Sequence, residues 1–472
     1  MQSSGRRVSQ SSERRKDLIC SHRPVGGLSH LSIIPTDEGA QRRGYKTYLT
    51  AVRDRRYSSQ MIIRARTVVT MDRAPIENGA VAVAGNRIVD VGRFDEIKAR
   101  NAGNNLDLGE QVLLPGLINA HCHLDYTCLR GKIPTQKSFT DWIRAINAEK
   151  AKLSPKDYLA SIKEGFAEVR RFGTTTVANL TAFPDLVPEI HAPIRTWWFA
   201  ELIDVRAPDR ASEIADLAIE SLKCAQNWGL APHALFTASN DLYRRSEEVA
   251  RRENVLLTTH LAESSEEMEM FHNASGPLYE FLKGIGRQMD DCGNETPLEL
   301  FLHLIGRAGS PNRPRAVAVN RPYLPWIIAH LNELAESDFE LLEKSKTKFH
   351  VVHSPRSHDY FKHNQFHFER LHSLGFNICL GTDSLASNKT LSLFAEMRAF
   401  QRSEPGISAD EILKMVTVNP AMALHQENVI GRIRPGFCAD LVAVQCSEGD
   451  NPFDQIVGFD GLIDWIMVNG KL

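Results

Sequence analysis

Short apolar runs alternate with amphipathic segments through the middle of the chain, and this alternation limits the fold more than any other feature. Eight runs occur between residues 115 and 425: LINAHCH, TTTVANL, TWWFAEL, APHALFT, VLLTTHL, PWIIAHL, FHVVHSP and NICLGTD. Segments with helical spacing separate them, such as DYLASIKEGFAEVRRFG and SEIADLAIESLKCAQNWG. A strand followed by a helix, repeated eight times, is typical of a (β/α)8 barrel. We therefore predict an α/β fold in which residues 115–425 form a TIM barrel.

The two ends of the remaining chain both have the character of strands. MIIRARTVVTM and AVAVAGNRIVDVG alternate apolar and polar residues near the amino end, and ADLVAVQ and LIDWIMVNGKL do so near the carboxyl end. The simplest arrangement joins these segments in one layer. We expect residues 61–114 and 426–472 to form a small composite β-sandwich domain that frames the barrel.

Residues 1–60 differ in composition from everything that follows. They are rich in Ser, Arg and Gln and lack the apolar core of a signal peptide. Three interpretations stay open: a disordered basic tail, an organellar transit peptide, which the acidic residues disfavour, or an extension outside the natural protein, whose start would then be Met61. In each case we expect a protein that begins at Met61 to fold and to keep its activity.

A longer excursion separates the fifth and sixth apolar runs. It covers residues 268–320 and contains the stretch SPNRPR, which has the composition of a loop. We expect the rest of this excursion to form extra helices over one face of the barrel.

Charge and cysteine content exclude several classes of protein. The formal net charge of −2 gives no general attraction to nucleic acid or to an anionic membrane. No run of 18 or more apolar residues indicates a membrane span. The eight cysteines form neither a CxxC pair nor a dense framework, which is typical of a reduced, cytoplasmic protein. We expect a small-molecule substrate and no nucleic-acid or membrane partner, and the sequence leaves a homo-oligomer open.

Residues with catalytic chemistry stand at the ends of the apolar runs. Active sites of TIM barrels lie at the carboxyl ends of the strands. The runs end in or close to these residues: His121, His123, Asn179, Glu201, His233, His260, His330, His353 and Asp383. Packing alone does not place so many histidines at strand ends. The pattern predicts an active site where these ends meet.

His121 and His123 are two residues apart, so on a strand both imidazoles point to the same side. An isolated pair of this kind is more often two buried core histidines. Here His260 and Asp383 end other runs of the same barrel, so four groups of metal-binding type converge. Such ligands suit zinc, and also iron or manganese. They leave a position for water, whose pKa a divalent ion lowers toward neutrality. We predict one catalytic divalent metal ion.

Two further residues near these run ends could move protons. Glu263 follows His260 closely and can shuttle a proton between water and substrate, unless it is a solvated charge at the start of the acidic stretch ESSEEMEM. His330 can hydrogen-bond the attacking hydroxide or the substrate, unless it is a core histidine. For His233 and His353, substrate contact and a core position are equally open.

With these residues in view, the chain resembles the amidohydrolase superfamily, in the branch of cytosine deaminase-like, chlorohydrolase-like and S-adenosylhomocysteine deaminase-like enzymes. The matching stretches follow one another in family order over nearly everything after Met61: LLPGLINAHCHLDYTCLRG, FGTTTVANL, APHALFTAS, THLAES, IIAHLNE, HSPRSH, LGTDSLASNKTLSLFAEMR, TVNPAMALH and IGRIRPGFCADLVAV. The resemblance implies that four residues bind the metal: His121, His123, His260 and Asp383. It further implies that Glu263 is the catalytic Glu and that His330 orients the hydroxide. His233 would be the substrate-contacting His.

The resemblance also bears on the number of metal ions. Members with two metals usually carry a bridging carboxylated Lys on the fourth strand. The stretch APHALFT contains no Lys, which favours a single ion. Glu201, at the end of the third run, is the alternative bridge to a second ion.

A narrower resemblance concerns the substrate. The stretches HLAESSEEMEMF, GPLYEFL, HSPRSHDYF and GTDSLASN resemble enzymes that deaminate 6-aminodeoxyfutalosine and related adenosine compounds. In DWIRAINAEK, Trp142 could stack on a base and Arg144 could bind a substrate carboxylate. The alternative for both residues is a polar helix surface.

Three hypotheses for the function follow. In the first, a metal-bound hydroxide deaminates an adenine-type nucleoside derivative, such as 6-aminodeoxyfutalosine or an adenosine-like compound; Glu263 protonates the ring nitrogen, while Asp383 and His330 handle the hydroxide proton. In the second, the same site deaminates guanine or cytosine, dechlorinates a triazine or opens a cyclic amide. In the third, a barrel without metal serves as an assembly protein, which the complete ligand set disfavours. The unrelated zinc deaminases with HxE and PCxxC motifs are excluded, because no two cysteines are three residues apart.

Overall fold

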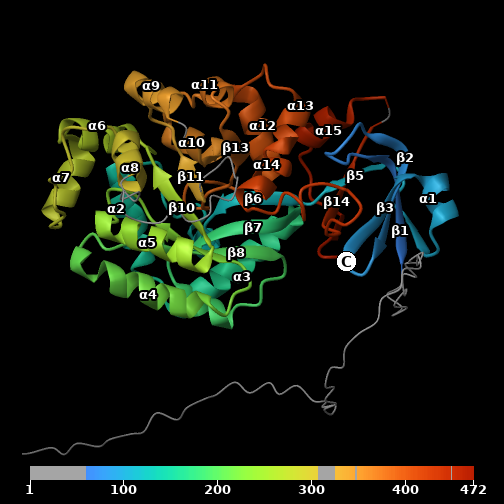
Figure 1. Cartoon of the computed structure of the whole chain (residues 1–472), viewed down its shortest axis with the longest axis horizontal. Coiled ribbons are helices and arrows are strands. Elements are labelled where there is room, and N and C mark those ends of the chain that lie inside the picture. The colour runs from blue at the N-terminus through green and yellow to red at the C-terminus, as the bar shows by residue number, and fades with distance from the viewer. Residues whose placement is uncertain (1–59, 307–324, 346–347, 448) are drawn as a thin grey trace, which may run out of the picture. The chain divides into compact units, whose positions relative to one another are not determined.

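The computed structural model describes residues 60–306, 325–345, 348–447 and 449–472 (Figure 1). The three interpretations of residues 1–60 concern residues that, apart from Gln60, lie outside this described part, and so does the predicted SPNRPR loop. No helix in the described part has both the length and the apolar character needed to cross a membrane.

Both ends of the described chain contribute strands to one sheet, in the order β15-β14-β5-β1-β2-β3, with β4 also paired to β1 (Figure 1). The strands are β1 (Met61–Val68), β2 (Ile76–Ala84), β3 (Arg87–Arg93), β4 (Asn104–Asp107), β5 (Gln111–Pro115), β14 (Leu441–Gln445) and β15 (Trp465–Met467). The antiparallel pairing of β14 with β5 joins the two ends, from Leu441 opposite Pro115 to Gln445 opposite Gln111. Ile97 of α1 (Phe94–Arg100) packs against Ile62 of β1. The predicted β domain built from both chain ends is confirmed, as a seven-stranded sheet.

Eight parallel strands form the second sheet, with neighbours that follow one another in the sequence. They are β6 (Leu117–Cys122), β7 (Thr174–Thr181), β8 (Arg195–Leu202), β9 (Trp228–Pro232), β10 (Leu256–Leu261), β11 (Trp326–His330), β12 (His350–His353) and β13 (Asn377–Leu380). A parallel bridge between Cys122 and Asp383 connects the first strand to the end of the last. The N–H groups of Thr382 and Asp383 both donate to the carbonyl of His121. The predicted TIM barrel is confirmed.

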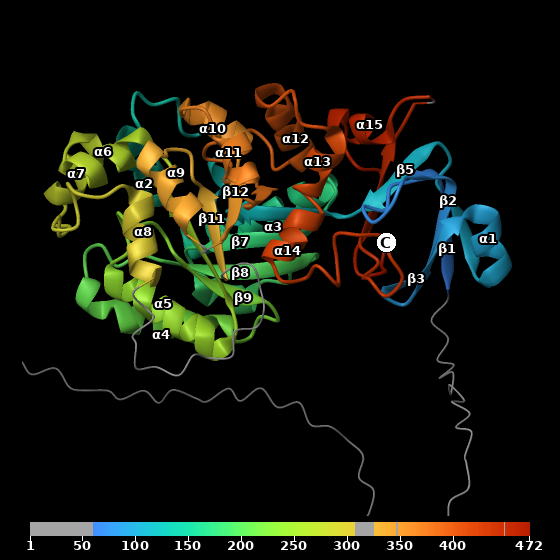
Figure 2. The same cartoon turned by 45° about the horizontal axis from the view of Figure 1, so that its top comes forward.

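Helices cover the outside of these strands (Figures 1 and 2). They are α2 (Phe139–Lys150), α3 (Pro155–Arg171), α4 (Ala211–Leu222), α5 (Asn240–Glu253), α6 (Ser265–Asn273), α7 (Gly276–Gly284), α8 (Pro297–Gly306), α9 (Glu336–Lys344), α10 (Pro355–Phe361), α11 (Phe368–Ser373), α12 (Leu393–Ser403), α13 (Ala409–Lys414), α14 (Val418–Ala423) and α15 (Pro452–Gly458). Local sequence explains many of their ends. In α3, Ser154 and Asp157 form a capping box at the start, and Gly173 takes a left-handed φ of 79° just past the end.

The excursion between β10 and β11 contains helices, as its sequence predicts. These are α6, α7 and α8, which lie close together at one end of the barrel (Figure 2).

Two predicted elements end at other residues. The fourth strand is WGLAP rather than APHALFT. The regular strand ends at Pro232, although His233 still bonds to Leu202 and His260, and Ala234 forms an isolated parallel bridge with His260. Leu235 and Phe236 are buried but outside the strand, so their apolar character reports burial and not strand pairing. The helix predicted to extend to Gly229 stops at Leu222. Gly229 lies in β9, where an added Cβ would approach the carbonyl oxygen of Leu256 to 2.5 Å.

Gly381 makes the close approach of β13 to β6 possible and gives a first prediction. A Cβ at this position would lie 2.8 Å from both Cβ and the carbonyl oxygen of His121. Gly381→Ala should therefore separate the two strands and lower the free energy of unfolding by about 1–3 kcal/mol. Urea denaturation measures this loss. Gly406→Ala is the matched control, because a Cβ there meets no atom within 4 Å. Equal urea midpoints for the two variants would show that the contact between β13 and β6 does not require a glycine at position 381.

Candidate metal centre and active site

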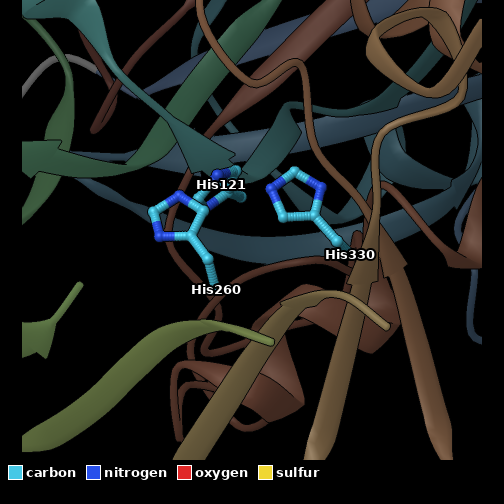
Figure 3. A group of neighbouring side chains, drawn as sticks. All are labelled: His121, His260 and His330. Carbon is cyan, nitrogen blue, oxygen red and sulfur yellow. The ribbon is translucent and has the colours of Figure 1, made fainter. Parts of the chain in front are cut away.

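Strand ends from opposite parts of the sequence bring the predicted ligands together. His121 lies in β6, His123 follows it, His260 lies in β10, His330 ends β11, and Asp383 follows β13. Nitrogen or oxygen atoms of His121, His123 and Asp383 lie within 4.8 Å of one another, and so do atoms of His121, His260 and His330. Figure 3 shows the rings of His121, His260 and His330 converging. The barrel thus gathers all four predicted ligands, with His330 beside them.

The donor set fits a single divalent ion. Nδ1 of His260 lies 2.9 Å from the carbonyl of His233 and donates to it, so its Nε2 carries a lone pair. That Nε2 faces Nε2 of His123 at 3.2 Å, close to the separation of about 3.3 Å between two nitrogen ligands of one zinc ion. Neither ring nitrogen of His121 has a hydrogen-bond partner among the described residues, although both are buried. A cation would satisfy these nitrogens together.

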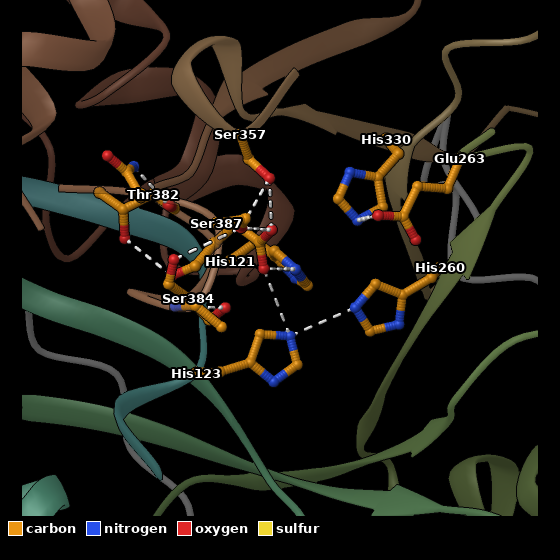
Figure 4. A network of polar contacts seen from close by, with 12 residues as sticks. His121, His123, His260, Glu263, His330, Ser357, Thr382, Ser384 and Ser387 are labelled. Atoms are coloured by element: carbon orange, nitrogen blue, oxygen red, sulfur yellow. Dashed lines mark hydrogen bonds and ion pairs between the residues drawn. The ribbon is translucent and has the colours of Figure 1, made fainter. Parts of the chain in front are cut away.

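Two serines orient the carboxylate of Asp383 (Figure 4). The hydroxyls of Ser357 and Ser387 donate to its Oδ2 at 2.7 and 3.0 Å. Its Oδ1 is thereby left toward the histidines, 3.7 Å from Nε2 of both His121 and His123. Such supporting hydrogen bonds hold a metal ligand in its binding orientation.

Strained backbone accompanies the site. Four residues at strand ends adopt left-handed φ angles without being glycine: Ala262 (50°), His330 (72°), Leu331 (52°) and Asp383 (53°). Such conformations are uncommon and cost free energy, and they persist where the surrounding structure enforces them, often at active sites. Sequence patterns did not indicate this feature.

The electrostatic surroundings favour the metal-binding forms of these residues. Burial lowers the pKa of His260 to about 4 and the pKa values of His123 and His330 well below the usual range. Burial alone would raise the pKa of Asp383, but the imidazole of His121, whose Nε2 lies 3.7 Å from its Oδ1, and the imidazoles of His330 and His123 hold that pKa well below its usual value. Neutral imidazole and ionised carboxylate are the forms that bind a metal.

The surroundings of Glu263 raise its pKa, in contrast to the lowered pKa values of Asp383 and His330. Burial, and then the charges of Asp383 and Glu267, raise its pKa well above the usual value, which favours the protonated acid. Its Oε1 lies 3.7 Å from Nε2 of His330. Its backbone is fixed at both ends, because its N–H donates to Glu267 and its carbonyl accepts from Asn332. A protonated carboxyl held beside the metal-binding group can donate a proton to a substrate.

A cavity of about 810 Å³ gives access to these groups. Its polar lining includes His123, His260, Glu263, His330 and Asp383. Much of the remaining lining is apolar, from Ile143, Ile146, Ile203, Val205, Ile214, Phe236, Phe281, Leu282 and Ile285. The volume suits a substrate of drug-like size.

Comparison with known proteins identifies the family. The profile of the amidohydrolase family matches residues 112–472. The chain belongs to the amidohydrolase family. Residues 79–103, in the β domain, also match the profile of the bacterial imidazolonepropionase-like composite domain.

Among relatives of this amidohydrolase, the 5-methylthioadenosine/S-adenosylhomocysteine deaminase of Syntrophobacter fumaroxidans is 31% identical over 78% of this chain and 80% of its own length. The adenosine deaminase of Xanthomonas campestris, solved with bound zinc, is 23% identical, covers 88% of this chain and 92% of its own, and superposes with a TM-score of 0.70. The aminofutalosine deaminase of Helicobacter pylori, in complex with methylthio-coformycin, is 20% identical and covers 87% of this chain and 99% of its own, with a TM-score of 0.73. Both solved structures share the fold.

The structure brings only some of the predicted substrate contacts to the cavity of the amidohydrolase. Trp142 and His233 line it. Arg144 is not among the lining residues: its side chain is half exposed, its Nη1 lies 3.0 Å from Asp141, and its guanidinium lies over the ring of Phe281, which does line the cavity. His353 does not line the cavity either. Its ring stacks on that of Phe366, with the ring centroids 4.0 Å apart.

Sequence reasoning missed several residues of the site. Tyr126 and Lys150 line the cavity, and Ser357 and Ser387 hold Asp383. Tyr126 directly follows the HCHLD stretch and could have been noticed from that position. Ser357 and Ser387 occur in the stretches HSPRSH and GTDSLAS, but nothing in the spacing showed that both point to one carboxylate.

The donor set predicts one divalent ion per chain. Elemental analysis of the purified protein should find about one equivalent, and His260→Ala should lower this content because a ligand of the group is lost. His191→Ala, which changes an exposed histidine, is the control. Two equivalents per chain at full activity would contradict the single-ion arrangement and would bring Glu201 into the metal site.

A buried histidine outside the site predicts how stability changes with pH. His350, at the start of β12, accepts a hydrogen bond from Asn377 at 2.8 Å. Burial and then the nearby His425 lower its pKa to about 3, whereas an unfolded histidine has a pKa of about 6.5. Between these values only the unfolded chain takes up the proton, so stability falls as the pH drops below about 6.5.

His350→Gln should remove this part of the acid sensitivity. The wild-type free energy of unfolding should fall between pH 7 and pH 5 by about 2 kcal/mol more than that of the variant. Urea denaturation at both pH values measures the difference. The control variant His191→Gln should lose as much unfolding free energy between pH 7 and pH 5 as the wild type. If His350→Gln also lost as much as the wild type, the imidazole of His350 would not resist protonation in the fold.

Proposed function

We propose that this amidohydrolase hydrolyses the exocyclic amine of an adenine-type nucleoside derivative, with one zinc ion held by His121, His123, His260 and Asp383. The chain is a hydrolase of carbon–nitrogen bonds, and its named relatives include deaminases of adenosine-type nucleosides. The observation that carries the proposal is the buried Glu263, whose Oε1 lies 3.7 Å from Nε2 of His330 in the same cavity as the metal-binding group; burial raises the pKa of this carboxyl and favours its protonated form. Deamination of an adenine needs an acid at this place, since the ring nitrogen must gain a proton.

The bound metal ion supplies Lewis-acid activation of water. Glu263 donates its proton to the ring nitrogen next to the amine-bearing carbon, which makes that carbon more electrophilic. His330 hydrogen-bonds the oxygen that attacks, and Asp383 accepts the proton that this oxygen gives up. The carbon–nitrogen bond then breaks, and the amine leaves as ammonia after it takes up the proton that Asp383 accepted. The second proton of the attacking water returns to Glu263 and replaces the one that this residue gave to the ring nitrogen. Water is consumed, and a 6-oxopurine and ammonia are formed.

The cavity walls suit such a substrate. Phe139 and Trp142 stack on each other with ring centroids 5.9 Å apart, and both line the cavity. An aromatic wall favours a flat heterocycle. The apolar residues of the lining favour adenine nucleosides whose 5′-substituent is apolar, and the cavity volume allows one larger than a hydroxyl.

Glu263→Gln tests the proposed acid directly. The amide has nearly the same shape but cannot donate and regain a proton, so turnover of adenosine or 5′-methylthioadenosine should fall by about 10²- to 10⁴-fold. Metal content and thermal stability should stay close to wild type. The release of ammonia and the absorbance change of the purine measure turnover, and elemental analysis measures the metal.

Two variants complete this test. His260→Ala should lose metal and activity together, whereas Glu280→Gln, which changes an exposed carboxylate, should leave both unchanged. Near-normal turnover by Glu263→Gln would remove this residue from the mechanism. Turnover of guanine, cytosine or a chlorinated triazine without any turnover of adenine nucleosides would overturn the proposed substrate class.

A further inference from the structure

Several polar side chains line the cavity without belonging to the metal group or to the proton-transfer pair. Three of these form a group beside His123. They are Tyr126, which follows β6, Lys150, which ends α2, and Glu201, near the end of β8. The proposed deamination gives none of them a task. Their chemistry indicates which part of a substrate lies against them.

Glu201 offers a buried acceptor. Its side chain is only 4% exposed, and its Oε1 lies 3.8 Å from Nδ1 of His123 and 3.9 Å from Nε2 of His233. Neither distance is that of a hydrogen bond. A buried carboxylate is costly without hydrogen-bond donors, so donors on a ligand would be bound strongly here.

His233 presents a second acceptor on the same side. Its Nδ1 lies 2.6 Å from Oγ1 of Thr237, and that hydroxyl donates to the carbonyl of Ala234 at 3.3 Å. Thr237 therefore accepts a hydrogen bond from Nδ1–H of His233. The other nitrogen, Nε2, is left as a lone pair beside Glu201.

Tyr126 and Lys150 supply donors next to these acceptors. The hydroxyl of Tyr126 is buried next to Glu201, and its interaction with that carboxylate is one of the effects that lower the pKa of Glu201 against burial. The ammonium group of Lys150 lies 4.7 Å from the centre of the Tyr126 ring. An anion at this place would be repelled by Glu201, and a cation would be repelled by Lys150. Hydroxyl groups fit both, because each one donates and accepts.

We propose that Glu201 binds the vicinal 2′- and 3′-hydroxyls of the ribose of the substrate, and that this contact makes the enzyme selective for ribonucleosides. The two carboxylate oxygens accept from the two adjacent hydroxyls, while Lys150 and Tyr126 donate to the hydroxyl oxygens. This inference rests on the proposed function, since it assigns the sugar of the same nucleoside. Glu201 acts here as a specificity-determining residue and does not bridge a second metal ion.

The test compares four nucleosides on the metal-loaded enzyme. The wild type should deaminate adenosine with a kcat/KM roughly 10- to 100-fold above that for 2′-deoxyadenosine and 3′-deoxyadenosine, the size expected for a hydrogen bond to a charged group. 5′-Deoxyadenosine, which keeps both hydroxyls, should resemble adenosine. In Glu201→Met, the kcat/KM for adenosine should fall to that for 2′-deoxyadenosine and 3′-deoxyadenosine. The kcat/KM values for these two deoxynucleosides should themselves change little. Lys150→Met should also reduce the difference in kcat/KM between adenosine and the two deoxynucleosides.

A binding measurement supports the kinetic one. The Kd of inosine, the deamination product of adenosine, should lie below that of 2′-deoxyinosine in the wild type, and titration calorimetry should show this difference disappear in Glu201→Met. Elemental analysis should find unchanged metal in that variant, and Glu280→Met, at an exposed position, should keep the wild-type ratios.

The outcomes separate this inference from the proposed function. An equal loss for all four nucleosides in Glu201→Met, or a loss of metal, would overturn the sugar contact. Deamination of adenosine and both deoxynucleosides at equal rates by the wild type would also overturn it and would leave the proposed function standing. A lack of deamination of every adenine nucleoside would overturn the proposed function, and this inference with it.

Discussion

The closure of the barrel between β6 and β13 is the constraint on which the rest of the site depends. The carbonyl of His121 accepts hydrogen bonds from Thr382 and Asp383, and Gly381 allows the two strands to approach. This seam joins residues more than 250 positions apart in the sequence. Because His121 and Asp383 are neighbours only across it, a metal-binding group of imidazoles and carboxylate exists only when all eight strands are in place.

The same closure creates an environment that would be unfavourable without a bound cation. Buried imidazoles stay neutral, a carboxylate stays ionised among them, and several backbone angles are left-handed at the strand ends. Hydrogen bonds from Ser357 and Ser387 offset part of this cost by satisfying one oxygen of Asp383. Glu263, close by, is favoured in its protonated form. One cavity therefore holds two carboxyl groups whose pKa values are driven in opposite directions by their surroundings, which is the arrangement that the proposed deamination uses.

Much of the fold and the ligand set could be predicted from the sequence, because both rest on local patterns. The alternation of apolar runs with helical segments indicates a barrel, and the spacing of His121 and His123 puts both rings on one side of a strand. Strand ends meet at one face of such a barrel, so His260 and Asp383 could be assigned to the same place without knowing any distance. The APHALFT run shows the limit of this reasoning, because buried apolar residues that follow a strand look like strand residues themselves.

The directions of side chains could not be predicted in this way. Arg144 and Trp142 are two residues apart on α2, yet Trp142 lines the cavity while the half-exposed Arg144 pairs with Asp141. His353 ends a barrel strand as His330 does, but it stacks on Phe366 instead of facing the cavity. By itself, the sequence determined the barrel, the residue types at its strand ends and the chemistry that those types allow. Only the tertiary structure decided which of these residues meet, because each meeting depends on packing between elements far apart in the chain.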